Sequence, residues 1–378
     1  MPQFNKTGEC TLLLVIGARP QFIKAAAMSA GIQAWNEEAR SPRFKEILVH
    51  TGQHYDFDLS QSFFEELQLP EPHVNLDVKS GTHAVQTARM MMGLEKAIEE
   101  QSPDWVIVFG DTNSTLAGVL TAAKLRIPVA HVEAGLREDN RHIPEEVNKI
   151  VADHLSEWCF APTQTAMETL VREGLAERSF LVGDIMLDTT RRMLERQSRS
   201  NLSEILGRFG VVPNEFALAT THRAAIRERR EFLRDVLEAL RELPIPVVLP
   251  LHPSTRAAIA QHRLEALIEP GSNLHVVPPA TYSEMIALLS QCRIVLTDSG
   301  GLIKEAYYFM KPCVTLDYQT EWIETLEGGW NIVAGPHKAQ ILHAAATVKP
   351  DPSLYRKDIF GCGDTTRKIL EILNTGKD

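Results

Sequence analysis

Short, continuously apolar segments alternate with longer amphipathic stretches along this chain, and this pattern limits its fold more than any other feature. Segments such as TLLLVIG (11–17) and DWVIVFG (104–110) lack the apolar–polar alternation of a half-exposed strand. They are typical of strands in a parallel sheet that helices cover on both faces. The pattern therefore predicts repeated βαβ units and a doubly wound α/β fold. We expect strands at 11–17, 46–52, 104–110, 128–135, 157–163, 179–184, 216–222, 246–252, 273–279, 293–301 and 312–317.

The strand pattern stops at a polar, charged stretch at about 191–212 and then starts again. A chain of 378 residues is too long for one ordinary core and suits two α/β domains. We therefore expect an N-terminal Rossmann-like domain over 1–185 and a C-terminal Rossmann-like domain over 186–357. The carboxyl ends of both sheets should line a cleft between the domains, where ligands of open α/β sheets bind.

Composition excludes several classes of protein. A formal net charge of -10 argues against nucleic-acid binding through overall charge. No apolar run approaches the roughly 18 residues of a membrane span, and the opening MPQFNKTGEC does not resemble a signal peptide. The five cysteines are scattered and include no CxxC pair, so we expect reduced thiols. These features favour a cytoplasmic protein with neither nucleic-acid nor membrane partners.

Polar clusters follow the predicted strands of the first half. Arg19 and Lys24 lie on either side of a turn into a helix that opens at Pro20, an arrangement suited to a pyrophosphate. Asp111 and Glu133 each end a buried strand, and Glu145 begins the next helix. Converging carboxylates shift one another's pKa and so supply an acid and a base at one pH. The alternative for Glu145 is a purely structural role at the positive end of its helix.

The second half contributes THR (221–223), LHP (251–253) and DSGGLIKEA (298–306). The backbone N–H groups of a glycine-rich turn before a helix can hold phosphate oxygens, which indicates a site at Ser299, Gly300 and Gly301. Glu305 could accept hydrogen bonds from a ribose diol. His222 is a candidate general acid or phosphate partner, with a structural histidine as the alternative.

Several motifs of other enzyme classes are absent from the sequence. The chain contains no G-x-G-x-x-G after the first strand, no P-loop, no H-E-x-x-H and no paired Cys/His spacing. We therefore expect no nicotinamide or flavin cofactor and no metal. The residues by themselves indicate cofactor-free acid–base chemistry on a phosphorylated or nucleotide-linked small molecule.

An ordered set of segments from about residue 16 to 370 resembles the non-hydrolysing UDP-N-acetylglucosamine 2-epimerase family. The segments are GARPQFIKA, HTGQHYD, GDTNSTLAG, HVEAGLR, IPEEVN, THR, PLHP, TDSGGLIKEA and GCGDTTRKI. The resemblance implies the two-domain GT-B arrangement, a C-terminal helix at about 358–378 that packs back on the first domain, and a homodimer. It also implies a role in making precursors of surface polysaccharides.

The family interconverts UDP-N-acetylglucosamine and UDP-N-acetylmannosamine by eliminating and re-adding UDP through a 2-acetamidoglucal, without a cofactor. By resemblance, Asp111, Glu133, Glu145 and His222 are catalytic, and Gln53 and His54 are candidates for an allosteric site. The residues expected to bind substrate are Arg19, Lys24, Arg137, Arg223, His252, Ser299, Gly300, Gly301 and Glu305.

The chain departs from the family pattern at two places. Ala225 in THRAAI stands where the family has a glutamate, and QTEWIE (319–324) replaces a TERPE-like run. The second departure resembles the branch that acts on UDP-2,3-diacetamido-2,3-dideoxyglucuronate, whose carboxylate calls for an extra cation. The candidates for that cation are Arg137, Arg141, His142 and Arg223. A hydrolysing 2-epimerase, a GT-B glycosyltransferase and an inactive UDP-sugar-binding protein remain alternatives.

Overall fold

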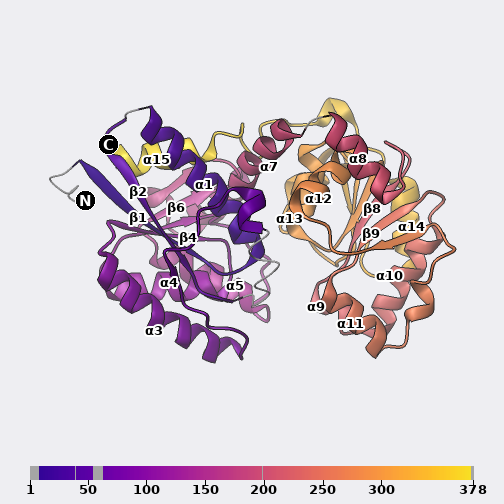
Figure 1. Ribbon diagram of the computed structural model, residues 1–378, viewed down its shortest axis with the longest axis horizontal. Helices are drawn as coiled ribbons and strands as arrows, with labels where there is room; N and C mark the ends of the chain where they lie inside the picture. Colours follow the sequence, from indigo (N-terminus) through magenta and orange to yellow (C-terminus); the bar gives the residue numbers. More distant parts are fainter. Residues whose placement is uncertain (1–7, 39, 54–62, 198, 376–378) are drawn as a thin grey trace. The chain divides into compact units, whose positions relative to one another are not determined.

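A computed structural model describes residues 8–38, 40–53, 63–197 and 199–375 of the chain (Figure 1). The chain divides into two compact units, Met1–Arg191 with Lys357–Asp378 and Arg192–Arg356. The division therefore lies within α7 (Ile185–Arg196), and α15 (Thr365–Thr375) belongs to the first unit.

The first unit is built on a parallel sheet whose described strands have the order β3-β2-β1-β4-β5-β6-β7. The strands are β1 (Glu9–Ile16), β2 (Arg43–His50), β3 (Val74–Asn75), β4 (Trp105–Phe109), β5 (Val129–Val132), β6 (Trp158–Ala161) and β7 (Ser179–Leu181). The other helices are α1 (Arg19–Glu37), α3 (His83–Gln101), α4 (Asn113–Lys124), α5 (Pro144–Leu155), α6 (Gln164–Arg172) and the short 3-10 helix η1 (Ala176–Arg178). The strand order reverses direction between β1 and β4.

The second unit repeats this topology with the strand order β10-β9-β8-β11-β12-β13, again all parallel. Its strands are β8 (Ala217–Thr220), β9 (Val247–Pro250), β10 (Leu274–Val277), β11 (Ile294–Thr297), β12 (Cys313–Thr315) and β13 (Asn331–Val333). Its helices are α8 (Arg199–Phe209), α9 (Ala224–Arg227), α10 (Arg230–Glu242), α11 (Pro253–Gln261), α12 (Tyr282–Gln291), α13 (Gly300–Tyr308) and α14 (Lys338–Thr347), with the 3-10 helices η2 (Glu265–Leu267), η3 (Ile323–Gly329) and η4 (Pro352–Leu354). Here the order reverses between β8 and β11.

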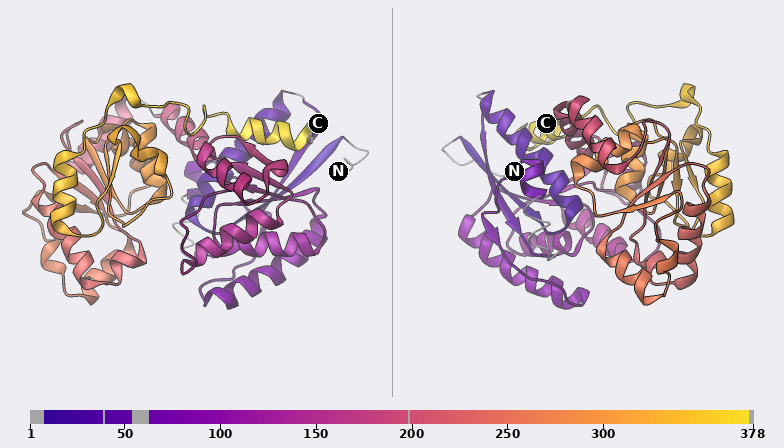
Figure 2. Two further views of the ribbon diagram at one scale, coloured as in Figure 1. Left: turned by 180° about the vertical axis from the view of Figure 1, so that it is seen from behind. Right: turned by 45° about the vertical axis from the view of Figure 1, so that its right-hand side comes forward.

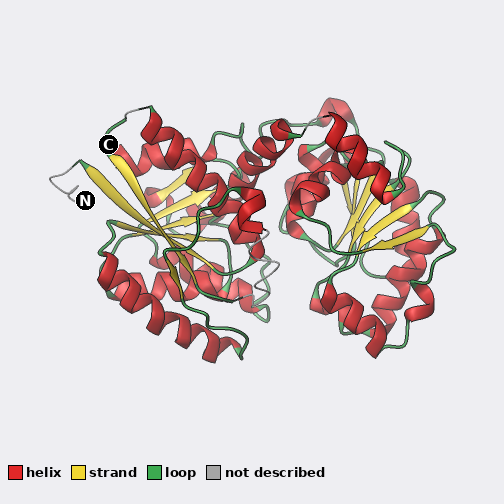
Figure 3. Ribbon diagram, viewed as in Figure 1, coloured by secondary structure: helices red, strands yellow, loops and turns green. Residues whose placement is uncertain are grey.

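The expectation of two doubly wound Rossmann-like domains is confirmed, and helices cover both faces of each sheet (Figure 3). Each predicted strand is present, although several are shorter than the apolar segments that predicted them. The sequence did not reveal β3 or β13. Strand β3 has two residues and β13 three, and each contains at most two apolar side chains, so neither strand by itself produces an apolar run.

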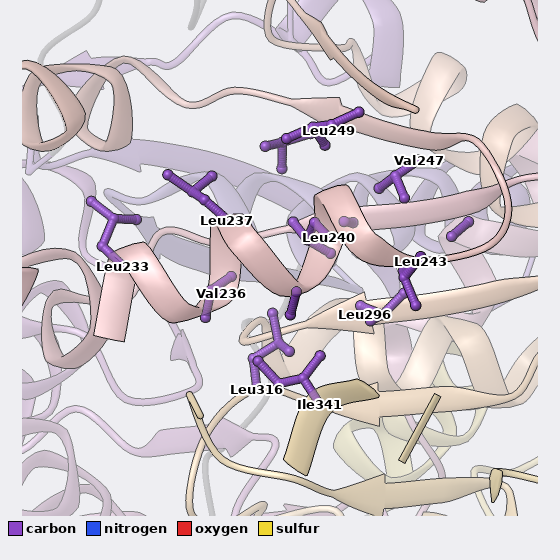
Figure 4. Close-up of a cluster of buried hydrophobic side chains, with 14 of the residues drawn as sticks. Leu233, Val236, Leu237, Leu240, Leu243, Val247, Leu249, Leu296, Leu316 and Ile341 are labelled. Atoms are coloured by element: carbon purple, nitrogen blue, oxygen red, sulfur yellow. The ribbon is translucent and has the colours of Figure 1, made fainter. Parts of the chain in front are cut away.

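Helix α10 shows how the amphipathic stretches meet the sheet of the second unit (Figure 4). Leu233, Val236, Leu237 and Leu240 recur at the spacing of one helix face, and all four are fully buried. They belong to the same cluster as the strand residues Val247, Leu249 and Leu296, together with Leu316 and Ile341. The helical period and the apolar strands therefore specify one shared core.

The end of the chain returns to the first unit, where α15 lies beside α1 (Figures 1 and 2). The two helices approach closely at Gly31, where a Cβ atom would lie 2.1 Å from Cγ2 of Thr366. The buried carboxylate of Asp188 on α7 accepts hydrogen bonds from the backbone N–H groups of Thr365 (3.3 Å) and Thr366 (2.8 Å). These bonds satisfy donors at the start of α15 that the helix itself leaves open.

Within the described parts of the chain, none of the helices combines the length and apolar character that crossing a membrane requires.

Asp188 should make the stability of the first unit depend on pH. Burial raises the pKa of Asp188 from 3.8 to about 6, although the hydrogen bonds from Thr366 and Thr365 oppose this shift. A raised pKa means that stability is fully present below pH 3.8 and is lost as the pH rises through 6. We expect parent and Asp188→Asn to diverge over this range by up to roughly 3 kcal/mol in unfolding free energy, with the parent losing stability relative to the variant.

Urea unfolding of parent and Asp188→Asn between pH 4 and 7 measures this difference. Glu99→Gln is the matched control, because Glu99 is exposed on α3 of the same unit. A constant difference between parent and Asp188→Asn across the pH range would contradict the assignment.

Candidate functional site

The reversal of strand order determines where each unit can bind a ligand. Connections from neighbouring strands leave in opposite directions at such a point, so a crevice opens at the carboxyl ends of the two strands. In the first unit this point is between β1 and β4, and in the second unit between β8 and β11. The segments that follow these strands, and β5 next to β4, carry most of the residues that the sequence singled out.

Gln21 holds the switch point of the first sheet together. Its Oε1 accepts from the backbone N–H groups of Gly17 (2.8 Å) and Ala18 (3.1 Å) after β1. Its Nε2 donates to the carbonyl of Phe109 at the end of β4 (2.9 Å) and to Oγ1 of Thr115 on α4 (3.1 Å). One buried side chain therefore ties two strand ends to one another.

Lys24 and Glu133 form a nearly buried ion pair next to this junction. Nζ of Lys24 donates to Oε1 of Glu133, and the lysine is only 5% exposed. A Cβ atom on Gly110 would lie 2.9 Å from Nζ of Lys24 and 3.4 Å from Oε1 of Glu133, and the φ of Gly110 is +62°. Only glycine suits this position, since both its backbone conformation and the space it leaves are required. Glu133 itself has a φ of 72°, an uncommon conformation for a residue other than glycine.

Asp111 follows Gly110 and remains accessible, with 36% of its side chain exposed. Its Oδ2 lies 4.0 Å from Nζ of Lys149, which lies 3.8 Å from Oε2 of Glu146. The buried carboxylate of Glu146 also accepts from the backbone N–H groups of Glu138 and Asp139. Glu145 occupies the first turn of α5 and is exposed. The structure thus connects Asp111 to the start of α5 through Lys149.

Arg137 has carboxylate partners within the protein. Its guanidinium pairs with both oxygens of Glu173 (2.9 and 2.7 Å) and lies 2.8 Å from Oδ2 of Asp153, and only 5% of its side chain is exposed. Asp153 also binds Nδ1 of His131 (2.7 Å), whose Nε2 donates to the carbonyl of Gly110 (2.8 Å). Burial by itself would raise the pKa of Asp153, but His131 and Arg137 lower it below its ordinary value. Arg137 is therefore paired with protein carboxylates, and these contacts stabilise the loops after β4 and β5.

Arg19 and Gln53 border the same strand ends. The guanidinium of Arg19 lies 4.5 Å from the ring centroid of Phe63, and burial lowers its pKa despite the nearby Glu66. Oε1 of Gln53 accepts from the backbone N–H (3.1 Å) and hydroxyl (2.7 Å) of Ser114 at the start of α4. His54, the other candidate for an allosteric site, lies outside the described residues.

Asp298 organises the switch point of the second sheet. Its Oδ2 accepts from the backbone N–H groups of His222 (2.7 Å) and Arg223 (2.9 Å) and from the hydroxyl of Thr221 (3.2 Å). Its Oδ1 lies 3.5 Å from Nδ1 of His222. Asp298 is buried, whereas 46% of the His222 side chain is exposed. The histidine ring is therefore backed by a carboxylate and keeps its opposite nitrogen, Nε2, available to a ligand.

Two further predicted residues flank His222. The ring of His252 lies 6.2 Å from the ring of His222, and its Nδ1 accepts from the backbone N–H of Ser254 as the cap of α11. Arg223 pairs with Oδ2 of Asp317 at 2.8 Å and retains 34% exposure of its side chain. The structure brings both histidines and Arg223 into one part of the second unit.

The glycine-rich turn forms the start of α13. Ser299 is the cap residue, and its side chain makes no capping hydrogen bond, so the N–H groups of the first turn can serve an anion. Glu305, one turn further, is buried and accepts a 2.6 Å hydrogen bond from the hydroxyl of Tyr282 on α12.

Sequence reasoning overlooked the residues that position these groups, namely Gln21, Lys149, Asp153, Tyr282 and Asp298. Only Asp298 had a usable signal, because it directly follows a buried strand at the switch point. Among the described residues, no group of three or more His, Cys, Asp and Glu side chains is arranged to hold a metal ion.

Comparisons with known proteins show which proteins the chain is similar to. Residues 36–374 match the family described as UDP-N-acetylglucosamine 2-epimerase. A UDP-N-acetylglucosamine 2-epimerase homolog from Methanococcus maripaludis is 41% identical over 362 residues, covering 96% of this chain and 99% of that protein. The UDP-2,3-diacetamido-2,3-dideoxy-D-glucuronate 2-epimerase of Pseudomonas aeruginosa is 41% identical over 369 residues, covering 96% and 99%. The structure of Methanocaldococcus jannaschii UDP-GlcNAc 2-epimerase, in complex with UDP-GlcNAc and UDP, superposes with a TM-score of 0.86 at 34% identity, covering 97% of this chain and 100% of that one.

The contact between Asp298 and His222 predicts the tautomer of the histidine. A carboxylate only accepts, so the neutral ring should carry its proton on Nδ1 in the parent. In Asp298→Asn the amide oxygen should keep the backbone hydrogen bonds and turn the NH₂ group toward the ring, which moves the proton to Nε2. Multiple-bond ¹H–¹⁵N NMR at a pH where the ring is neutral distinguishes the two forms, and His222→Gln identifies the signal.

Asp317→Asn is the control for this experiment, because Asp317 pairs with Arg223 instead of His222. The same tautomer in parent and Asp298→Asn would show that the carboxylate does not orient the ring.

Proposed function

Because the chain belongs to the UDP-N-acetylglucosamine 2-epimerase family, we propose that it is an isomerase that inverts carbon 2 of a UDP-activated N-acetylhexosamine. The proposed reaction interconverts UDP-N-acetylglucosamine and UDP-N-acetylmannosamine. The observation that carries the proposal is the Lys24–Glu133 pair against Gly110 and Asp111, at the switch point of the first sheet. This arrangement places one carboxylate in a sheltered ion pair beside a second carboxylate that a ligand can reach.

The reaction proceeds by elimination and re-addition. A carboxylate removes the proton from carbon 2, and the electron pair of that C–H bond forms the double bond to carbon 1. The C1–O bond to UDP breaks, which leaves a 2-acetamidoglucal and UDP. Return of a proton to carbon 2 on the opposite face and re-addition of UDP at carbon 1 then give the epimer. Asp111, Glu133 and Glu145 are the proposed acid and base residues.

The second unit is proposed to hold UDP as it leaves and returns. The first turn of α13, at Ser299, Gly300 and Gly301, suits the diphosphate, and Glu305 suits the ribose hydroxyls. His222 can donate from Nε2 to the departing phosphate while Asp298 stabilises the charge of its ring. Arg19 in the first unit is a further proposed phosphate ligand, and His252 and Arg223 are proposed to line the site near His222.

A second candidate substrate is UDP-2,3-diacetamido-2,3-dideoxyglucuronate, converted by the same steps. The favouring observation is the 41% identity over 369 residues to the Pseudomonas aeruginosa enzyme named for that substrate, against 35% over 371 residues to the Methanocaldococcus jannaschii UDP-N-acetylglucosamine 2-epimerase. Among the cations considered for the uronate carboxylate, Arg137 already forms ion pairs with Asp153 and Glu173. Arg141 and His142 are exposed, and Arg223 is partly exposed, so these three remain the proposed candidates.

We also propose a cytoplasmic homodimer that supplies precursors for surface polysaccharides. The support for a dimer is an apolar groove in the first unit, between α3, α4 and α5, with a volume of about 400 Å³. It is lined by His83, Ala84, Thr87, Ala88, Met91, Asn113, Leu116, Pro144, Val147 and Asn148. The exposed side chains of Val85 and Met92 extend this apolar surface along α3. Apolar patches of this kind are typical of protein interfaces.

Proton NMR of the purified protein with UDP-N-acetylglucosamine in D₂O tests the activity. We expect deuterium at carbon 2 together with the anomeric signal of UDP-N-acetylmannosamine. Asp111→Asn, Glu133→Gln and Glu145→Gln should each lower kcat by roughly 10²–10⁴-fold, because proton transfer then lacks its acid or base. Glu168→Gln is the matched control, because Glu168 is an exposed glutamate on α6, and this variant should keep full activity.

Other outcomes of this experiment separate the alternatives. Irreversible accumulation of UDP and free N-acetylmannosamine would indicate a hydrolysing 2-epimerase, and turnover that requires an added acceptor would indicate a glycosyltransferase. No exchange with UDP-N-acetylglucosamine, but exchange with the diacetamido uronate, would assign the second substrate. Binding of UDP without turnover of either substrate would indicate an inactive sensor and refute the proposed activity.

The proposed dimer predicts that charge in the groove separates the subunits. Val147→Asp and Ala88→Arg each place a charge where an apolar partner surface would pack, so sedimentation velocity should show a dimer in the parent and monomers in both variants. Leu354→Asp introduces a charge at an exposed leucine of the second unit and should leave the dimer intact. A monomeric parent, or variants that remain dimeric, would rule out this interface.

A further inference from the structure

Lys304 on α13 is a buried cation that the proposed mechanism does not use. The residue is 1% exposed, and its Nζ lies 4.0 Å from the ring centroid of Trp322, which is also 1% exposed. Removing an ammonium from water is costly, and the face of an indole ring recovers part of that cost.

The ammonium lies close to the first turn of α13. Helical side chains lean toward the helix N-terminus, so we infer that Lys304 leans toward Gly300, four residues earlier. The indole of Trp322 links the two positions, because its Nε1 lies 3.2 Å and its Cδ1 3.8 Å from where a Cβ on Gly300 would be. One ring therefore touches both the ammonium and the glycine turn.

The charges around this turn explain what the ammonium contributes. The start of α13 has a partial positive charge from its N–H groups, which favours an anion. However, a carboxylate also lies at this end of the helix, since Oε1 of Glu321 is 3.4 Å from the same Cβ position. It would repel a diphosphate. A buried cation is poorly screened by salt, so it offsets that repulsion effectively.

We propose that Lys304, seated on Trp322, is a positioning residue that keeps the start of α13 electropositive and thereby strengthens binding of the UDP diphosphate. Lys304 acts by making the electrostatic potential at the N–H groups of the turn more positive, and its contact with Trp322 fixes where the ammonium lies. The inference rests on the proposed function, since it assigns a further determinant to the UDP site of that reaction.

Binding of UDP and of uridine by the full-length protein tests the inference. Lys304→Met retains most of the side-chain volume without the charge, and Lys304→Gln is a second neutral variant in case the first fails to fold. We expect UDP affinity to fall on the order of tenfold in both, with uridine affinity unchanged, because uridine has no phosphate. Lys304→Arg should restore most of the loss.

Lys338→Met is the matched control, since it removes a lysine charge from the exposed start of α14, where Lys338 pairs with Glu238 and Glu242. UDP affinity equal to that of the parent in Lys304→Met, or an equal loss for UDP and uridine, would overturn the inference. A parent that binds UDP but turns over neither substrate would refute the proposed activity alone. A parent that does not bind UDP would refute both.

Discussion

Strands that are covered by helices on both faces can offer polar groups only at their ends. This constraint determines where the accessible polar side chains of each unit lie. The strand interiors of β4 and β5 are buried throughout, while Gly110, Asp111 and Glu133 follow directly where these strands stop. The reversal of strand order then selects the pair of strand ends at which the following loops diverge. In the second unit the same reversal selects the segments at His222 and Asp298. The repeated topology therefore places polar segments of different composition at the strand ends of the two units by one architectural rule.

Buried polar side chains hold these strand ends in place, and each one is hydrogen-bonded to backbone as well as to other side chains. Gln21 joins β1 to β4, the His131–Asp153–Arg137 network supports β4 and β5, and Asp298 joins β8 to β11. Buried networks of this kind are costly when one member is missing, so they specify one geometry. The groups proposed to meet the substrate are the accessible neighbours of these supports, such as Asp111 and His222. An acid–base site requires both features, because buried neighbours must hold the reacting groups rigidly while those groups stay accessible to the substrate.

Much of the fold was predictable, because continuous apolar runs report strands that are buried on both faces. Strands β3 and β13 escaped prediction because each has at most two apolar residues, whereas the short edge strand β7 was recognised through the longer segment SFLVGD (179–184). The site was predictable only in part. A cation such as Arg137 looks the same in sequence whether it meets a ligand or a protein carboxylate, and its partners Asp153 and Glu173 lie 16 and 36 positions further along the chain. Glu145 and Glu146 are adjacent, yet only Glu146 is buried.

The sequence by itself determined the two doubly wound units, the position of the polar clusters at strand ends and, through ordered motifs, the family. These properties depend on local periodicity and on residues that follow their strands directly. Tertiary structure alone decided which charges are paired, which carboxylates stay accessible, and that Lys304 lies on Trp322 beside the start of α13. The physical reason is that pairing and burial depend on contacts between segments far apart in the chain, and spacing along a sequence carries no record of those contacts.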